Sequence, residues 1–130
     1  HLQGRLHGLH KSVLTIILTY IIHMSVNKVI LLGHVGNDPE MRYPDKDRAV
    51  AYLSLATNEV RGSTRTEVTE WHYLVFVGQN ASLVERYVRK GTQLYVEGYL
   101  RSREYEDRMK ITRRRTEIIV EKFEILGRRS

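Results

Sequence analysis

Five stretches of the chain read as β-strands, and the second and fourth alternate apolar and polar residues with a period of two, the pattern of a strand that buries one face. These stretches cover residues 27–36, 49–57, 70–78, 93–107 and 116–126. Polar segments rich in Pro, Asp and Gly separate the strands and favour turns, and the long polar segment before the third stretch favours a loop or a hairpin. The pattern therefore predicts five strands.

Between the third and fourth strands the period changes to that of a helix. Residues 80–91 place four apolar or aromatic side chains at helical spacing, namely Leu83, Val84, Tyr87 and Val88. Ser82 and Glu85 have the spacing of a capping box, although Asn80 is an alternative cap. Five strands with one helix between the third and the fourth predict an all-β fold with one helix, a five-stranded Greek-key barrel of the OB-fold type.

The first 23 residues differ from the rest of the chain. They contain four of the six histidines and no acidic residue. Their apolar run, residues 13–22, is shorter than the roughly 20 residues that span a bilayer. We expect residues 1–23 to be an appendage and residues 24–130 to form the working domain. If the appendage is ordered, its β-branched residues favour a strand added to a neighbouring sheet edge.

The residue types needed for metal or catalytic chemistry do not form a pattern. His7 and His10 are three residues apart, but the carboxylate and the fixed framework that accompany metal ligands are absent. The chain has no cysteine, which excludes disulfides and thiolate ligands. Glycine-rich phosphate loops and nucleophile motifs are absent too, and the clustered acidic residues lie in or beside predicted turns. We expect no metal, no cofactor and no catalytic residue.

The charge of the chain favours an anionic partner. The net charge is +6 and the isoelectric point is about 9.7. Such a balance is compatible with nucleic acid, an acidic membrane surface or an acidic protein. Because no stretch is long enough to span a membrane, we expect no membrane partner.

One strand carries aromatic and basic residues on the face that should be exposed. In residues 93–107 this face consists of Tyr95, Glu97, Tyr99, Arg101, Arg103 and Tyr105. Unpaired bases stack on aromatic rings and phosphates pair with arginine, so the half from Arg101 to Tyr105 predicts a surface for single-stranded nucleic acid. The half from Tyr95 to Tyr99 is more apolar and predicts a subunit contact. Trp71 and basic loop residues would extend the nucleic-acid surface, namely Arg61, Arg65, Arg113, Arg114 and Arg115.

Several motifs together resemble the single-stranded DNA-binding proteins of bacteria, which mitochondria also carry. They are VNKVILLGHVGNDPEMRY, LATNE, TEWH, YVRKGTQLYVEGYLRSREYED and TEIIVEKFEILG, in the order of that family over residues 25–127. The resemblance implies an OB-fold homotetramer that binds single-stranded DNA without sequence preference and protects it during replication, recombination and repair. It also favours a cytoplasmic location at the bacterial nucleoid over a mitochondrial one.

The resemblance implies roles for individual residues on the DNA-binding surface. Trp71 and Tyr105 fall on positions where the family has base-stacking rings. Arg101 and Arg103 match a cationic pair of the family, and Arg42 matches a basic position beside the groove.

For the tetramer, the resemblance implies that His72, the histidine of TEWH, helps to hold the subunits together. Four further residues fall on positions near the contact between dimers, namely Lys28, Tyr95, Glu97 and Tyr99. On parity alone, His72 is a buried or interface residue rather than a general base.

The sequence departs from the family pattern at two stacking positions. Val60 follows LATNE where the family has a third ring, and Val77 stands where the family has phenylalanine, with Phe76 beside it on the opposite face. These departures predict weaker binding or a shift toward phosphate contacts. The Gly/Pro/Gln-rich linker and the acidic tip with which bacterial members recruit replication and repair enzymes are also absent, so we expect no acidic C-terminal tail for that recruitment.

Two other interpretations stay open at this stage. An OB-fold protein-interaction module of the primosome type would use the same tyrosine–arginine face for a protein partner, and it predicts little salt-dependent affinity for DNA. A small OB-fold hydrolase would need a metal-dependent activity, which the scattered acidic residues do not favour.

Overall fold

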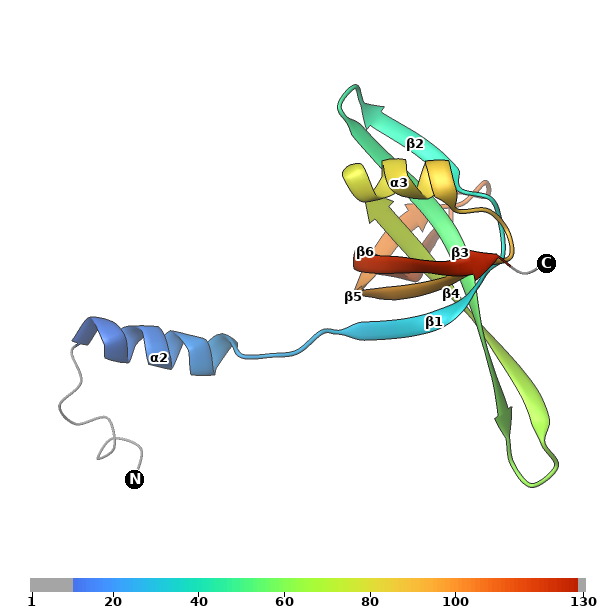
Figure 1. The fold of residues 1–130 in the computed structure, drawn as a ribbon. Helices are drawn as coiled ribbons and strands as arrows, with labels where there is room; N and C mark the ends of the chain where they lie inside the picture. The colour runs from blue at the N-terminus through green and yellow to red at the C-terminus, as the bar shows by residue number, and fades with distance from the viewer. Residues whose placement is uncertain (1–10, 129–130) are drawn as a thin grey trace.

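The structure, a computed structural model, describes residues 11–128, except for the side chains of residues 20–23. Its elements in chain order are α2 (Lys11–His23), β1 (Val29–Val35), β2 (Glu40–Asp45), β3 (Arg48–Arg61), β4 (Thr66–Val77), α3 (Gln79–Tyr87), β5 (Thr92–Glu106) and β6 (Thr112–Arg128). Figure 1 shows how the strands cross one another to build a barrel, with α3 packed beside it.

The strands form one sheet that closes on itself. Their order is β1-β5-β6-β4-β3-β2, and a further pairing of β1 with β3 completes the ring. The pairing of β4 with β6 is parallel, and the others are antiparallel. This closed sheet is the OB-fold that the alternating pattern predicts.

Alternate residues of the strands fill the barrel interior, because successive side chains of a strand point to opposite faces. The buried core includes Val35, Leu53, Leu55, Leu74, Phe76, Leu94, Val96, Ile118 and Val120, each at most 5% exposed. The intervening residues of the same strands therefore face outward and form the outer surface of the barrel.

The structure has one strand more than the five that the sequence predicts. Residues 40–45 read as polar and contain Pro44, which favours turns, yet they pair with β3 as the edge strand β2. The pairing is irregular between Arg42 and Asp45, on either side of Pro44, which has no N–H to donate to a ladder. A polar edge strand with an irregularity gives little signal in the sequence, which is why this strand was not expected.

The helix α3 lies between β4 and β5 and closes one side of the barrel. Ala81, Val84 and Val88 pack into the core and are fully buried. The expected side-chain caps are wrong, because the helix begins after Gly78, which has a φ of 67° and provides no side-chain hydrogen bond. The helix ends at Tyr87, before Lys90 and Gly91.

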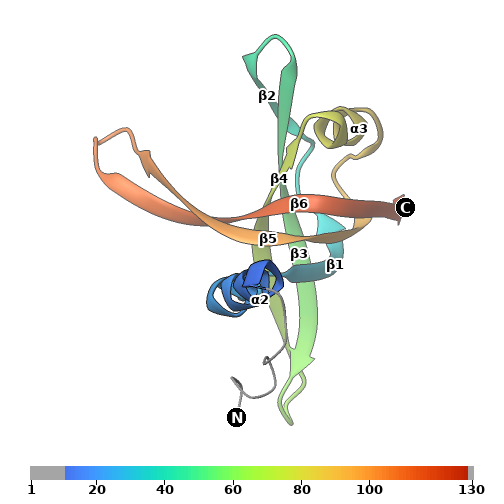
Figure 2. The ribbon, with the colours of Figure 1, turned by 90° about the vertical axis from the view of Figure 1, so that its left-hand side faces the viewer.

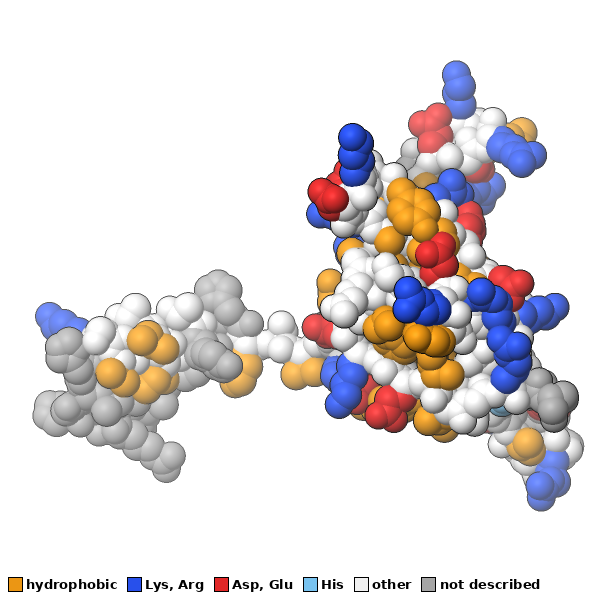
Figure 3. Space-filling model, turned by 45° about the horizontal axis from the view of Figure 1, so that its top comes forward, with side chains coloured by type: hydrophobic (Ala, Val, Ile, Leu, Met, Phe, Trp, Pro, Cys, Tyr) orange, Lys and Arg blue, Asp and Glu red, His pale blue; other side chains and the backbone are white. Residues whose placement is uncertain are grey.

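Residues 11–23 form a helix, so the strand considered for the N-terminal segment is wrong. Helix α2 stands apart from the barrel in Figure 1, and an extended segment joins it to β1. Apolar side chains such as Val13, Ile16 and Leu18 remain exposed on it, and part of this apolar surface is visible in Figure 3. Neither described helix combines the length and the apolar character that a membrane crossing requires.

Two long hairpins extend from the barrel. The β3–β4 hairpin turns at residues 62–65, and the β5–β6 hairpin turns at residues 107–111. Figure 2 shows that they leave the barrel in different directions. Of the two alternatives predicted between the second and third strands, a loop or a hairpin, the structure has the hairpin, and strand pairing continues to Arg61 and Thr66.

Candidate nucleic-acid interface

One outer face of the barrel, formed by β3, β4, β6 and β5, carries aromatic and basic side chains; we call it the outer face. Directly opposite residues of neighbouring antiparallel strands project to the same side. On this face the opposite pairs are Ser54–Tyr73 and Ala56–Trp71 between β3 and β4, and Arg103–Arg115 and Tyr105–Arg113 between β5 and β6. The parallel contact of β4 with β6 joins the two hairpins into one continuous surface.

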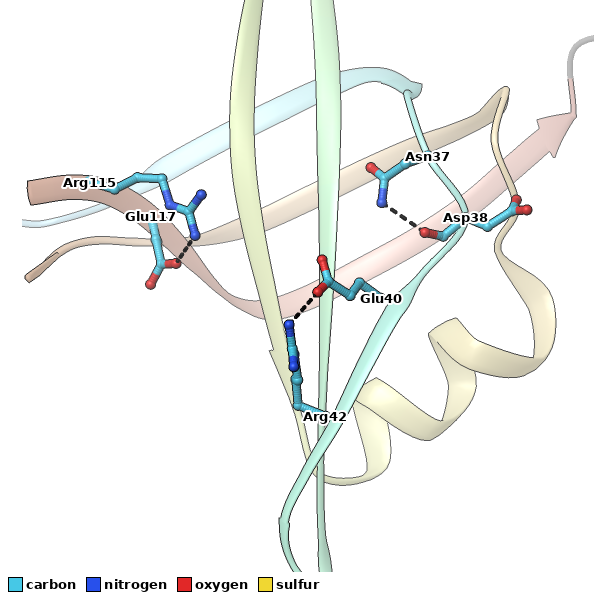
Figure 4. Close-up of polar contacts among 6 residues, drawn as sticks. All are labelled: Asn37, Asp38, Glu40, Arg42, Arg115 and Glu117. Atoms are coloured by element: carbon cyan, nitrogen blue, oxygen red, sulfur yellow. Dashed lines mark hydrogen bonds and ion pairs between the residues drawn. The ribbon is translucent and has the colours of Figure 1, made fainter. Parts of the chain in front are cut away.

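A cleft of about 480 Å³ opens on the outer face; we call it the arginine cleft. Its lining includes Arg42, Tyr52, Tyr73, Arg103, Arg115 and Glu117. Figure 4 shows that β6 contributes Arg115 and Glu117, whereas β2 contributes Glu40 and Arg42. Residues of β2 and β6, which are more than 70 positions apart in the sequence, therefore meet in one concave site.

Glu117 is buried between two arginines of this cleft. Its side chain is 1% exposed, and its Oε1 lies 3.2 Å from Nε of Arg103 while its Oε2 lies 3.5 Å from an Nη of Arg115. Neither contact has hydrogen-bond geometry, so both carboxylate oxygens and both Nε atoms lack a hydrogen-bond partner among the described residues. The three side chains are therefore held together mainly by charge.

The same two arginines lie over tyrosine rings. The guanidinium carbon of Arg115 is 4.7 Å from the ring centroid of Tyr73 and 5.5 Å from that of Tyr105. The guanidinium of Arg103 is 6.0 Å from the ring centroid of Tyr52. Contacts within about 6 Å are favourable cation–π interactions. Both arginines of the cleft thus lie close to tyrosine rings, and arginine and tyrosine planes can stack with nucleobases.

Trp71 lies at the edge of a second cleft, of about 620 Å³, which is also lined by Asn58, Thr69 and Lys90. The indole is 53% exposed. Gly36 allows the ring to lie close to the backbone, because a Cβ there would be 2.4 Å from Cζ3 of Trp71. The backbone of Gly36 thus packs against one side of the indole, and about half of the Trp71 surface remains exposed to solvent.

Two of the predicted cationic residues, Arg101 and Arg42, differ in whether they form an ion pair. Arg101 is exposed and lies opposite Glu117 in the strand register, and it forms no ion pair among residues 11–128. Arg42 is paired with Glu40 at 2.6 Å, but both side chains are more than half exposed. An exposed pair of this kind contributes little stability and exchanges readily with another anion.

The other predicted DNA-contacting residues are spread more widely. Val77 is 43% exposed at the end of β4 and lies opposite Val50, which lies opposite Arg42 of β2. Arg61 and Arg65 lie on the β3–β4 hairpin, outside both clefts. Arg61 donates hydrogen bonds to Glu59, which lower the pKa of that carboxyl.

Three arginines expected in a loop instead lie on β6. Arg113, Arg114 and Arg115 are opposite Tyr105, Glu104 and Arg103 respectively. The hairpin turn is therefore shorter than expected, and alternation directs the side chains of Arg113 and Arg115 to the outer face and that of Arg114 to the other side. Arg115 becomes part of the arginine cleft in this way.

The residues of the arginine cleft that the sequence did not predict include Tyr52, Tyr73 and Glu117. Tyr73 has the same parity as Trp71, and that signal was sufficient to place it on the outer face. Glu117 reads as one polar residue at the start of an apolar strand, and its position depends on the pairing of β4 with β6.

Three of the five residues predicted near subunit contacts form a separate group on β5 and directly before β1, namely Lys28, Tyr95 and Glu97. Lys28 pairs with Glu97 at 2.9 Å, and the Tyr95 hydroxyl donates a hydrogen bond to the same carboxylate. These contacts, first that of Tyr95 and then that of Lys28, lower the pKa of Glu97. Beside them on β1, Ile30 and Leu32 are 59% and 51% exposed.

The two remaining predicted contact residues lie away from that ion pair. Tyr99 is partly buried and lies opposite Ile119. His72 is partly buried on β4, and its Nε2 is 2.8 Å from the Thr57 hydroxyl.

Metal ligands do not converge in the described part of the chain. Among residues 11–128, no group of three or more His, Cys, Asp or Glu side chains could hold a metal ion. His7 and His10 lie outside the described residues. On the face that Figure 3 shows, lysine and arginine side chains are interspersed with acidic ones.

A closed OB barrel that presents arginines, tyrosines and an exposed tryptophan on one face defines an oligonucleotide-binding protein of the OB-fold class. The profile of the Single-strand binding protein family matches residues 26–126. The chain therefore belongs to this family.

Two relatives agree with this assignment. The chain is 45% identical over 109 residues to the single-stranded DNA-binding protein of Bacteroides thetaiotaomicron, which covers 80% of this chain and 68% of the relative. The structure is similar to that of the Plasmodium falciparum SSB in complex with ssDNA, with a TM-score of 0.70 and 34% identity over 81% of this chain and 96% of the other.

Proposed function

We propose that this protein binds single-stranded DNA without sequence preference and protects it. The observation that carries this proposal is the arginine cleft, where Arg103 and Arg115 lie over three tyrosine rings on the outer face. Guanidinium groups bind phosphate and stack on bases, and every base has a face that can stack on a ring. Single-strand-binding proteins are themselves type examples of this combination.

The surroundings of the cleft support a path for an extended strand rather than a small-molecule pocket. Trp71 borders the second cleft, and Arg101, which has no ion-pair partner among residues 11–128, lies on the same outer face as the arginine cleft. The cationic and aromatic groups are therefore distributed along a surface. Such a distribution suits a chain of nucleotides, each of which brings one phosphate and one base.

A strand bound in this manner would be shielded from pairing and from nucleases. We therefore assign the protein to the handling of single-stranded DNA in replication, recombination and repair. Membership of the Single-strand binding protein family supports this assignment.

We also propose that the chain works as a homotetramer. On β1, Ile30 and Leu32 expose apolar side chains beside the Lys28–Glu97 pair, and apolar residues flanked by polar ones are typical of subunit contacts. One edge of β1 pairs with β5, whereas β3 pairs only with its last residues, so a stretch of edge remains open.

A competition experiment tests the proposed function. Binding of fluorescein-labelled oligo-dT would be followed by anisotropy, with unlabelled single-stranded DNA of mixed sequence and its duplex as competitors, over a range of salt concentrations. We expect the single strands to compete regardless of sequence, the duplex to compete poorly, and log Kd to depend linearly on log salt concentration. Equal competition by duplex, or binding that is insensitive to salt, would refute the proposal and favour a protein-interaction module.

A further inference from the structure

Glu117 is the one acidic side chain of the outer face that is buried at the centre of the cationic site. Its side chain is 1% exposed, and it stands within 3.5 Å of two arginines. A negative charge at this place opposes an anionic ligand in simple electrostatic terms. Burying a carboxylate is costly unless charged partners surround it. Its presence in a surface for DNA therefore needs a physical reason.

The strand register supplies that reason. Arg103 and Arg115 lie directly opposite each other on β5 and β6, and like charges in that arrangement repel. Both are partly buried, with side chains 41% and 34% exposed, so solvent screens the repulsion only in part. The carboxylate between them neutralises one of the two charges and allows both guanidinium groups to stay within the cleft.

The positions of the guanidinium groups depend on this carboxylate. Glu117 engages Nε of Arg103 and one Nη of Arg115, which leaves other N–H donors of both groups unused by it. The same placement keeps Arg115 over Tyr73 and Tyr105. Without the carboxylate, repulsion would drive the two arginines apart and away from the tyrosine rings.

We propose that Glu117 is a positioning residue for DNA binding, which holds Arg103 and Arg115 in a stacked arrangement ready for a phosphate and its neighbouring bases. The inference rests on the proposed function. Net charge alone predicts that removing a negative charge strengthens the binding of an anion. The positioning role predicts the opposite, namely that removing the charge of Glu117 weakens the binding of DNA.

The test compares Glu117→Gln, which keeps the shape of the side chain and removes its charge, with Glu104→Gln. Glu104 is exposed, lies on the other side of the same strand pair and contacts Arg114 at 4.0 Å, so its variant makes the same change in charge. Affinity for labelled oligo-dT would be measured by anisotropy in the full chain. We expect about tenfold weaker binding for Glu117→Gln, the loss of about one charge-assisted contact. We expect Glu104→Gln to bind as tightly as wild type or more tightly.

A double-mutant cycle separates positioning from a general structural role. In the Arg115→Gln background, Glu117→Gln should have a markedly smaller effect than in wild type, because one of the two groups that the carboxylate positions is already gone. Equal effects in both backgrounds would overturn the inference. The salt dependence should also become less steep in Glu117→Gln, because fewer phosphate contacts are made.

Further variants cover a failure of Glu117→Gln to fold, which circular dichroism would reveal. Glu117→Asp keeps the charge and withdraws the carboxylate by one methylene, and it should also weaken binding. Wild-type affinity in Glu117→Asp, or undiminished affinity in a folded Glu117→Gln, would overturn the inference. If wild-type protein itself does not bind oligo-dT, the proposed function fails instead, so the two failures are distinguishable.

Discussion

Gly36 and Trp71 show, at the scale of single residues, how a missing side chain shapes the binding surface. A Cβ at residue 36 would stand only 2.4 Å from one of the ring carbons of the Trp71 indole, so the ring can occupy its place only because residue 36 is glycine. The backbone at residue 36 thus packs against one side of the ring, and Trp71 as a whole remains 53% exposed. A ring that is fixed before binding loses less conformational entropy when a base stacks on it.

Gly36→Ala should displace the indole and weaken DNA binding with little loss of stability, because an exposed ring can move away. We expect a shift of the Trp71 fluorescence maximum in the free protein and a few-fold increase in Kd for oligo-dT. Fluorescence spectra and anisotropy titrations on the same samples measure both. Unchanged spectra together with unchanged affinity would show that Gly36 does not support the ring.

Arg101 permits a second prediction at this scale, because it has no ion-pair partner in the part of the chain that the structure describes. Arg101→Gln should reduce affinity for oligo-dT of any sequence and reduce the salt slope by about 1, as expected for one lost phosphate contact. Arg86→Gln on α3 makes the same change in charge away from the outer face. If the two variants lower affinity equally, Arg101 acts only through net charge.

At the scale of elements, the β5–β6 hairpin positions most of the site. Its turn is held by Asp107, whose Oδ1 accepts hydrogen bonds from the Met109 and Ile111 amides and whose Oδ2 accepts one from Nε of Arg113. These contacts, first that of Arg113, hold the pKa of Asp107 below its ordinary value. The geometry of this turn sets the strand register, and Tyr105 therefore lies opposite Arg113 on the outer face.

The sign of this pKa shift sets a pH dependence for the hairpin. Because the folded-state pKa is lowered, the stabilisation by Asp107 is present above the unfolded-state pKa and is lost as pH falls through the folded-state value. Amide exchange at Ile111 should therefore speed up, relative to its intrinsic rate, only at acidic pH in wild type. In Asp107→Ala the exchange should be fast at neutral pH as well. Equal protection in both proteins at neutral pH would contradict this role.

The elements also show what can be predicted from the sequence. Alternation places Trp71, Arg103 and Tyr105 correctly on outward faces, because an apolar core imposes a period of two on every strand. Alternation cannot show that Glu117 lies in the same cleft as Tyr73, since that depends on which strands become neighbours. The strand considered for the N-terminal segment, if ordered, rested on β-branched residues alone, because a mostly apolar run has no clear period, and residues 11–23 form a helix instead.

At the scale of the whole molecule, the two proposed functions, DNA binding and assembly, belong to different surfaces. The outer face bears the arginine cleft and Trp71, whereas β1 bears Ile30 and Leu32 beside the Lys28–Glu97 pair. Assembly through one surface leaves the other free for a ligand. Several outer faces in one assembly would also bind a long strand more tightly than one, because later contacts become intramolecular.

The double variant Ile30→Glu, Leu32→Glu should divide the proposed tetramer. It adds two negative charges to each chain, so two chains that meet through this apolar contact would bring four buried negative charges together. Light scattering coupled to size-exclusion chromatography should give four times the chain mass of 15.3 kDa for wild type and a smaller multiple for the variant. Short oligomers should still bind to the variant, whereas affinity for long strands should fall. An unchanged mass would place the subunit contact elsewhere.

The measurement that tests the central claim most directly is a fluorescence titration of Trp71, the only tryptophan of the chain. Oligo-dT or a matched duplex would be added at low and at high salt. The account predicts strong quenching by the single strand, weak quenching by the duplex, and an affinity that falls steeply as salt rises. Fluorescence that stays bright with single-stranded DNA, or responds equally to duplex, would contradict the claim that the outer face stacks unpaired bases.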